Sequence, residues 1–152
     1  MNSIKIEIAR EQDSEVIREI YQTTFPEEES AMVAKLAVDL LAEKTIPQIL
    51  SLVAREFETT LGHVAFSPVK IKYNESCKAS ILAPLAVHPE HQQKKVGSRL
   101  IEFGLEKLKE AGGNIVFFMG TRSFMESSDL MLTPPMISRH PTVWNILLAG
   151  RL

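Results

Sequence analysis

The chain has 152 residues, the size of one ordinary domain, and we expect residues 1–152 to form a single domain. A net charge of -2, with 45% hydrophobic and 24% charged residues, excludes a disordered tail and argues against a nucleic-acid partner. No apolar run approaches the roughly 18 residues of a membrane span. The amino-terminal residues lack a signal-peptide core, and the single cysteine, Cys77, has no internal disulfide partner. We therefore expect a cytoplasmic protein that does not associate with membranes.

The first third of the chain predicts one strand followed by two helices. Ile4, Ile6 and Ile8 alternate with other residues at the period of a half-buried strand. Apolar residues at helical spacing predict a helix from about Asp13, which Pro26 ends because the residue before a proline disfavours helical geometry. The second predicted helix begins with three glutamates and carries an apolar stripe of Met32, Val33, Leu36, Leu40 and Leu41.

The rest of the chain predicts mostly strands. Residues 49–56, 61–71 and 79–90 are three β-rich runs, separated by turns at 58–60 and 73–78, and they predict an antiparallel meander. Residues 97–111 predict an amphipathic helix that Gly112 and Gly113 end. Residues 114–120 and 141–148 predict two further strands around an ill-defined stretch at 121–135. The order β-α-α-β-β-β-α-β-β indicates an α+β fold with a mixed central sheet flanked by helices.

The junction between the predicted strand at 81–87 and the helix from Gly97 is suited to an extended ligand. Pro84 cannot donate to a strand ladder, so we expect a bulge or splay that leaves neighbouring backbone groups unpaired. The turn that follows leads into a helix whose first amides lack internal acceptors, which makes an anion site. Lys94 and Lys95 add positive charge there.

Residues 82–112, "LAPLAVHPEHQQKKVGSRLIEFGLEKLKEAG", resemble the coenzyme-binding segment of the GNAT superfamily of acetyl-CoA-dependent N-acetyltransferases. The family signature, Gln/Arg-x-x-Gly-x-Gly/Ala, falls on residues 92–97. The resemblance covers most of the chain and is strongest from 50 to 120, in the manner of a bacterial branch of small predicted acyltransferases. It implies an acyl-CoA N-acyltransferase-like fold with a splayed fourth strand.

The resemblance also implies how acetyl-CoA binds. Backbone groups of Leu85, Ala86 and Val87 would pair with the pantetheine arm, and the thioester carbonyl would lie near the strand break. The cofactor-binding residues at the turn would be Gln92, Gln93, Lys94, Lys95, Val96, Gly97 and Ser98. The implied reaction is direct attack of a primary amine, on a small molecule or a peptide, on the thioester.

Two departures from the family pattern leave alternatives open. Lys95 stands where the signature has its first glycine, and Met125 stands where relatives commonly have the tyrosine that protonates the leaving thiolate. One alternative is therefore a catalytically impaired acyl-CoA-binding or regulatory protein of the same fold. Another is a degenerate domain that keeps only the fold and serves as an interaction module.

Each candidate catalytic residue also has a structural explanation. Glu28, with Glu27 and Glu29, lies where the family's substrate groove is usually walled and would attract a cationic amine, but a first helical turn favours carboxylates in any case. His63 would be a base near its ordinary pKa of about 6.5, or a packed or surface histidine. The histidines and the cysteine show no metal-site spacing, so we expect no metal. The final strand offers an edge for a homodimer.

Overall fold

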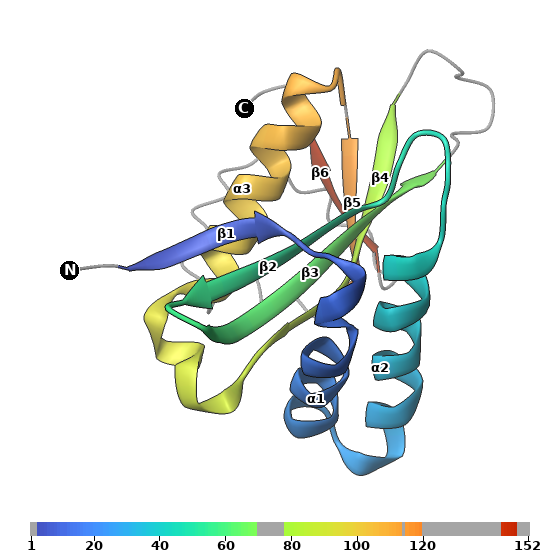
Figure 1. Ribbon diagram of the computed structural model, residues 1–152. Coiled ribbons are helices and arrows are strands. Elements are labelled where there is room, and N and C mark those ends of the chain that lie inside the picture. The colour runs from blue at the N-terminus through green and yellow to red at the C-terminus, as the bar shows by residue number, and fades with distance from the viewer. Residues whose placement is uncertain (1–2, 70–77, 114, 120–143, 149–152) are drawn as a thin grey trace.

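The computed structural model describes residues 3–69, 78–113, 115–119 and 144–148 of the chain (Figure 1). The strands are β1 (Ile4–Ile8), β2 (Leu50–Glu56), β3 (Thr59–Val69), β4 (Ala79–Val87), β5 (Ile115–Met119) and β6 (Trp144–Leu148). The helices are α1 (Ser14–Thr24), α2 (Glu27–Ala42) and α3 (Val96–Glu110), with short 3-10 helices η1 (Glu11–Asp13) and η2 (Pro89–Lys94). This order confirms the predicted α+β fold. Among the described helices, none has the length and apolar character needed to cross a membrane.

The six described strands join one sheet in the order β1-β2-β3-β4-β5-β6. The pairs from β1 to β4 are antiparallel, β4 and β5 are parallel, and β5 and β6 are antiparallel. The parallel pair needs a crossover connection, which α3 provides. The predicted mixed sheet and meander are thus confirmed. Since β6 is an outer strand of the described sheet, a homodimer through it stays a prediction.

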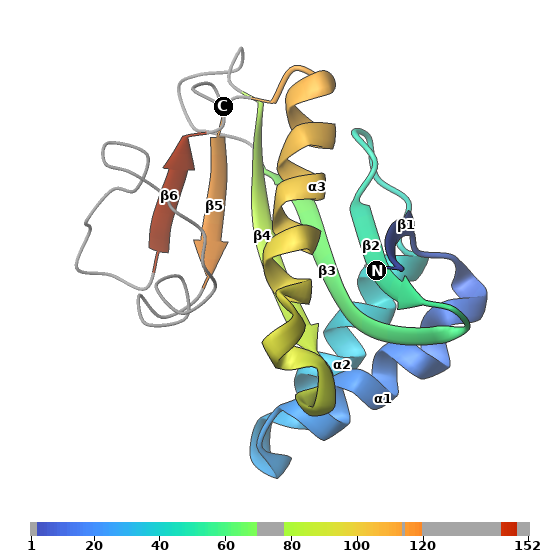
Figure 2. The same cartoon turned by 90° about the vertical axis from the view of Figure 1, so that its left-hand side faces the viewer.

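The helices form a layer on each face of the sheet, with α1 and α2 on one face and α3 on the other (Figures 1 and 2). Between α3 and the sheet lies the larger apolar cluster, which includes Leu52, Phe66, Leu82, Leu100 and Leu105. The smaller cluster lies under α1 and α2 and includes Ile17, Ile20, Tyr21, Ala34 and Val53. Alternation along β2 and β3 divides the strand side chains between these two clusters.

Helix α1 follows the sequence prediction closely. Ile17, Ile20 and Tyr21 face the sheet and are buried. The helix ends at Thr24, where Phe25 takes an extended conformation (φ -94°, ψ 153°) in front of Pro26. The Phe25 N–H still donates to the Tyr21 carbonyl at 3.1 Å, which satisfies one of the last carbonyls of the helix.

The predicted apolar stripe of α2 is partly wrong. Met32 and Leu36 are 70% and 45% exposed. The buried positions are instead the small residues Ser30, Ala34 and Ala37. These residues are spaced four and three apart, so they share one helix face that can approach its neighbours closely. A stripe of large apolar residues is therefore a poor guide when the packed face consists of alanines.

Several turns differ from the sequence predictions. The β2–β3 turn is formed by Phe57 and Glu58, one position earlier than expected, and Phe57 has φ 56°. The connection before α3 begins with the 3-10 helix η2. Of the alternating isoleucines, Ile4 is buried, but Ile8 at the other end of β1 is 63% exposed. Cys77, Met125, most of the predicted turn at 73–78 and the stretch at 121–135 lie outside the described residues.

Candidate functional site

Beyond Leu82, one edge of strand β4 has no pairing strand among the described residues. β3 pairs along β4 as far as Val87, whereas the parallel partner β5 pairs only from Ala79 to Leu82. Opposite Phe66 and Val64 of β3 lie Leu82 and Leu85, so the register shifts where Ala83 and Pro84 intervene. A proline cannot donate to the ladder, which explains the break. The predicted bulge and splay of the fourth strand are confirmed.

Two side chains close around the end of β4. The amide of Gln92 donates from Nε2 to the Val87 carbonyl at 3.1 Å, and the Thr24 hydroxyl donates to the same oxygen at 3.3 Å. Gln92, predicted to bind the cofactor, thus holds η2 against β4. Thr24 was not singled out from the sequence, and its contact brings the end of α1 and the start of α2 beside the end of β4.

Lys95 takes the left-handed conformation, with φ 59° and ψ 27°, directly between η2 and α3. This is the position at which the signature has its first glycine. The turn geometry therefore explains why the signature has a glycine here, because the left-handed conformation costs a residue with a side chain about 1–2 kcal/mol. The chain makes this turn with lysine in place of glycine.

The amino terminus of α3 is suited to an anion. Lys95 is the N-cap, makes no side-chain capping hydrogen bond, and is followed by a first turn without an acidic residue. Among the described residues, a Cβ built on Gly97 would meet only Val87 Cγ2, at 3.6 Å. Helix amides and the helix dipole favour a negative group at such an end. The first turn of α3, which contains Val96, Gly97 and Ser98, thus lies beside Val87 at the end of β4.

Lys94 points toward the end of β2. Its Nζ lies 3.4 Å from Glu56 Oε2, and the hydroxyl of Ser3 donates to the other carboxylate oxygen at 3.2 Å. The hydrogen bond from Ser3, followed by that from Lys94, lowers the pKa of Glu56 below its ordinary value. Part of the lysine charge is therefore already compensated by a carboxylate. The side chain of Gln93 lies outside the described part of the chain.

His63 is a core residue. Its side chain is 0% exposed, with Nδ1 2.8 Å from the Tyr21 hydroxyl and Nε2 2.6 Å from the Ser51 hydroxyl. Burial lowers the pKa of His63 to about 3, against a small opposing effect of Asp13, so the ring is neutral at pH 7. The packed-histidine interpretation is confirmed. A catalytic role stays a prediction, and any proton would have to pass through Tyr21 or Ser51.

Tyr21 and Ser51 were not predicted from the sequence as partners of His63. Tyr21 occupies a buried position of α1, where the apolar body of the ring fits and its hydroxyl needs a hydrogen-bond partner. Ser51 is a buried polar residue within an otherwise apolar run of β2. A polar residue at a core position is a signal that something across the interface must satisfy it.

Glu28 lies in the exposed first turn of α2, between Glu27 and Glu29. Pro26 is the N-cap and offers no side-chain cap, so three carboxylates occupy the electropositive end of the helix. The contact of Thr24 with Val87 places this end of the α1–α2 pair near the end of β4. The structure does not bring Glu28 into contact with His63.

The sequence showed no metal-site spacing among the histidines, but the structure brings two of them together with a glutamate. His88, Glu90 and His91 each offer a ligand atom, and these atoms lie within 4.8 Å of one another. Spacing alone missed them because the grouping depends on a tight turn, in which the His91 N–H donates to the His88 carbonyl at 2.8 Å. The expectation that the protein uses no metal is itself untested.

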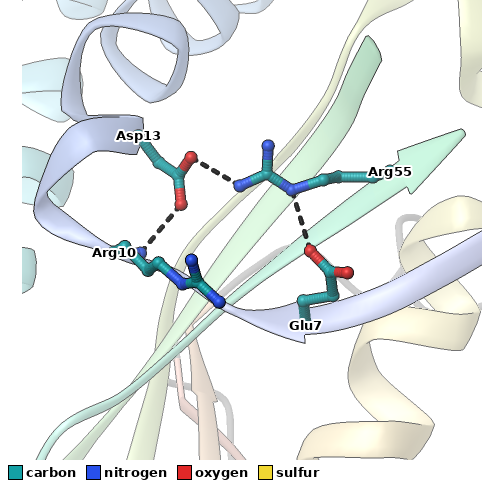
Figure 3. A network of polar contacts seen from close by, with 4 residues as sticks. All are labelled: Glu7, Arg10, Asp13 and Arg55. Atoms are coloured by element: carbon teal, nitrogen blue, oxygen red, sulfur yellow. Dashed lines mark hydrogen bonds and ion pairs between the residues drawn. The ribbon is translucent and has the colours of Figure 1, made fainter. Parts of the chain in front are cut away.

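A second polar cluster braces β1, η1 and β2 (Figure 3). Arg55 lies with Nε 3.0 Å from Glu7 Oε2 and with Nη2 beside Asp13 Oδ1, while the Arg10 N–H donates to Asp13 at 2.8 Å. Burial would raise the pKa of Asp13, but the hydrogen bonds from Arg10 and Arg55 hold it below its ordinary value. This network connects elements of the scaffold on the β1 side of the sheet.

The mixed sheet with a splayed fourth strand, covered by helices on both faces, is the fold of the acyl-CoA N-acyltransferases. Residues 5–127 match the family model described as an acetyltransferase (GNAT) domain. The chain therefore belongs to the GNAT acetyltransferase family.

Relatives and solved structures agree with this assignment. The uncharacterized N-acetyltransferase YjhQ of Escherichia coli strain K12 is 36% identical over 118 residues, which are 77% of this chain and 64% of that protein. A GNAT family acetyltransferase from Brucella melitensis, solved with acetyl-CoA, is 27% identical with a TM-score of 0.73, covering 95% of this chain and 87% of that one. The N-acetyltransferase YhbS from Escherichia coli, solved with CoA, is 26% identical with a TM-score of 0.73, covering 97% and 81%.

Proposed function

We propose that this protein transfers an acetyl group from acetyl-CoA to a primary amine. The observation that carries the proposal is the open edge of β4, which begins where β5 pairing stops at Leu82 and leads to the amino terminus of α3. An extended thioester with a pyrophosphate in its middle needs both features next to each other. The acetyl-CoA and CoA bound in the Brucella and Escherichia structures support the choice of cosubstrate.

In this proposal the pantetheine arm lies along Leu85, Ala86 and Val87 and extends the sheet in place of β5. Main-chain hydrogen bonding of an extended ligand to a strand edge gives affinity without requiring particular side chains. The pyrophosphate then reaches the turn from Gln93 to Ser98, where helix amides and the lysine charges favour it. Gln92 contributes by holding the turn against β4.

The amine enters from the side of α1 and α2, where Glu27, Glu28 and Glu29 provide negative charge. An amine with a pKa near 10.4 must lose a proton before it attacks, which costs about 4.6 kcal/mol at pH 7. Glu28 serves to attract the ammonium form and to accept or relay its proton. His63 is neutral at pH 7 and could take part only through Tyr21 or Ser51.

The test is an amine-dependent release of CoA from acetyl-CoA, followed with a thiol reagent across a library of small amines and lysine or amino-terminal peptides. At least one amine should accelerate thiol release, and mass spectrometry should show the amine heavier by one acetyl group. Glu28→Gln should raise KM for that amine, with Glu43→Gln, beyond the other end of α2, as the matched control. Tight CoA binding without acceleration by any amine would favour a non-catalytic acyl-CoA-binding protein.

A further inference from the structure

We propose that His88, Glu90 and His91 form a binding site for a divalent transition-metal cation of the zinc type. One ligand atom from each residue lies within 4.8 Å of the others. Ligands at the 2.0–2.2 Å bond lengths of zinc lie about 3.4 Å apart around a tetrahedral ion. Small side-chain rotations would therefore bring the three atoms to one cation.

The local fold sets up this grouping within four consecutive residues. His88 is the N-cap of η2 and Pro89 follows at its first position, which fixes the start of the 3-10 helix. The His91 N–H donates to the His88 carbonyl at 2.8 Å, and this tight turn leaves the rings of His88 and His91 5.7 Å apart at 52°. Both imidazoles thus face the same side, beside the exposed carboxylate of Glu90.

The hydrogen bonds of the two imidazoles leave room for a cation. Nδ1 of His91 is buried and has no hydrogen-bond partner among the described residues. Nδ1 of His88 accepts from the Glu90 N–H at 3.3 Å, a long contact. Coordination through Nδ1 replaces that contact, and coordination through Nε2 requires the proton on Nδ1. Either way the cost is one weak hydrogen bond.

Charges around the cluster do not oppose a cation strongly. Lys94 lies on the same 3-10 helix, but its ammonium is 3.4 Å from Glu56. Glu56 is close enough to His91 for the two to interact electrostatically. The negative charges of Glu90 and Glu56 therefore offset the positive charge of Lys94.

The ligand set selects the kind of cation. Two imidazoles and one carboxylate suit zinc and its first-row neighbours, whereas magnesium and calcium prefer oxygen ligands throughout. Three protein ligands leave a further position for water. The proposed acetyl transfer has no step at this cluster, although Glu90 and His91 share η2 with Gln92.

The test is calorimetric titration of the untagged protein with zinc chloride, together with the visible absorption of the cobalt(II) form. We expect one saturable site per chain and cobalt bands that indicate nitrogen ligation. His91→Ala and Glu90→Gln should each weaken zinc binding at least tenfold, since even outer-shell changes at metal sites cost about 10–100-fold. Glu106→Gln, which makes the same change at an exposed position of α3, is the matched control for Glu90→Gln and should bind zinc as the unaltered protein does.

The thermal midpoint of each variant, measured without metal, shows whether a variant that fails to bind zinc is still folded. Because His88 caps η2, the exposed Glu90→Gln carries the test if a His88 variant does not fold. Absence of saturable zinc binding, or binding that survives His88→Ala combined with His91→Ala, would overturn the proposal. An equal loss of zinc binding in Glu106→Gln would overturn it as well.

Discussion

The Tyr21 hydroxyl lies 2.8 Å from Nδ1 of His63 and joins α1 to β3 inside the core. On the other side of the ring, the Ser51 hydroxyl lies 2.6 Å from Nε2. The histidine is therefore held in place at both nitrogens, without exposure to solvent. Its neutral form is the one that this site accepts, since burial lowers its pKa to about 3.

The stability of the protein should fall as the pH drops from 6.5 toward 3. The unfolded chain binds a proton on His63 near pH 6.5 and the folded chain only near 3, so the stabilisation is complete above 6.5 and declines below it. The expected slope is about 1.4 kcal/mol per pH unit for this one group. Urea unfolding at pH 7, 6, 5 and 4 measures it. His63→Gln should flatten the slope and His91→Gln should not; an equal slope in His63→Gln would contradict the assignment.

Asp13→Asn should destabilise the protein at pH 7 by about 2 kcal/mol, the value of hydrogen bonds to a charged group. Asp13 is 4% exposed and accepts from the Arg10 N–H and the Arg55 guanidinium. Its folded pKa lies below the ordinary 3.8, so this stabilisation is present above pH 3.8 and is lost as the pH falls through the folded pKa. The difference between the variant and the unaltered protein should therefore shrink in strong acid.

The control for that prediction is Glu7→Gln. Glu7 pairs with the same guanidinium at 3.0 Å, but its side chain is half-exposed. Exposed ion pairs contribute about 0–1 kcal/mol. Equal losses from Asp13→Asn and Glu7→Gln, or a loss for Asp13→Asn that does not change with pH, would contradict the account of this network.

Gly104→Ala should destabilise the protein by about 1–3 kcal/mol, the usual cost of overpacking. A Cβ at Gly104 would lie 2.1 Å from Cε2 and 2.3 Å from Cζ of Phe66, a buried ring of β3. The clash outweighs the gain of about 1 kcal/mol in helix propensity. Thermal unfolding checks it, with Gly97→Ala of the same helix as the control. A rise in the melting temperature of Gly104→Ala would show that α3 does not approach β3 so closely.

The parts of the fold that the sequence predicted are those with local causes. The break in β4 follows from Pro84, and the end of α1 follows from Pro26, because each proline acts on its immediate neighbours. The coenzyme signature could also be located, since its turn and helix are consecutive. The left-handed Lys95 then gives a physical reason for the glycine that the family has at that position.

The features that the sequence did not predict depend on contacts between distant segments. The buried alanine face of α2 is defined by its packing in the cluster under α1 and α2. The hydrogen bonds of His63 with Tyr21 and Ser51 join three elements that are distant in the sequence. The grouping of His88 with His91 depended on whether the connection was a loose turn or a 3-10 helix. Hydrophobicity and spacing carry little information on any of these points.

Lys95→Gly should stabilise the protein by up to about 1 kcal/mol. Glycine removes the cost of the left-handed conformation, and its greater freedom in the unfolded chain offsets part of that gain. Chemical unfolding measures the change. Lys94→Gly, one residue earlier inside η2, is the control and should not stabilise. A loss of stability in Lys95→Gly would mean that contacts of the lysine side chain exceed the backbone cost.

The most direct test of the account is a calorimetric titration of the protein with acetyl-CoA. The unaltered protein should show saturable binding, and Gly97→Trp should abolish it because the indole fills the space in front of the first turn of α3. Gly97→Ala, whose Cβ would lie 3.6 Å from Val87 Cγ2, should keep its fold and would show that position 97 tolerates a side chain. Absence of binding to the unaltered protein, or equal binding by a folded Gly97→Trp variant, would contradict the assignment of this site.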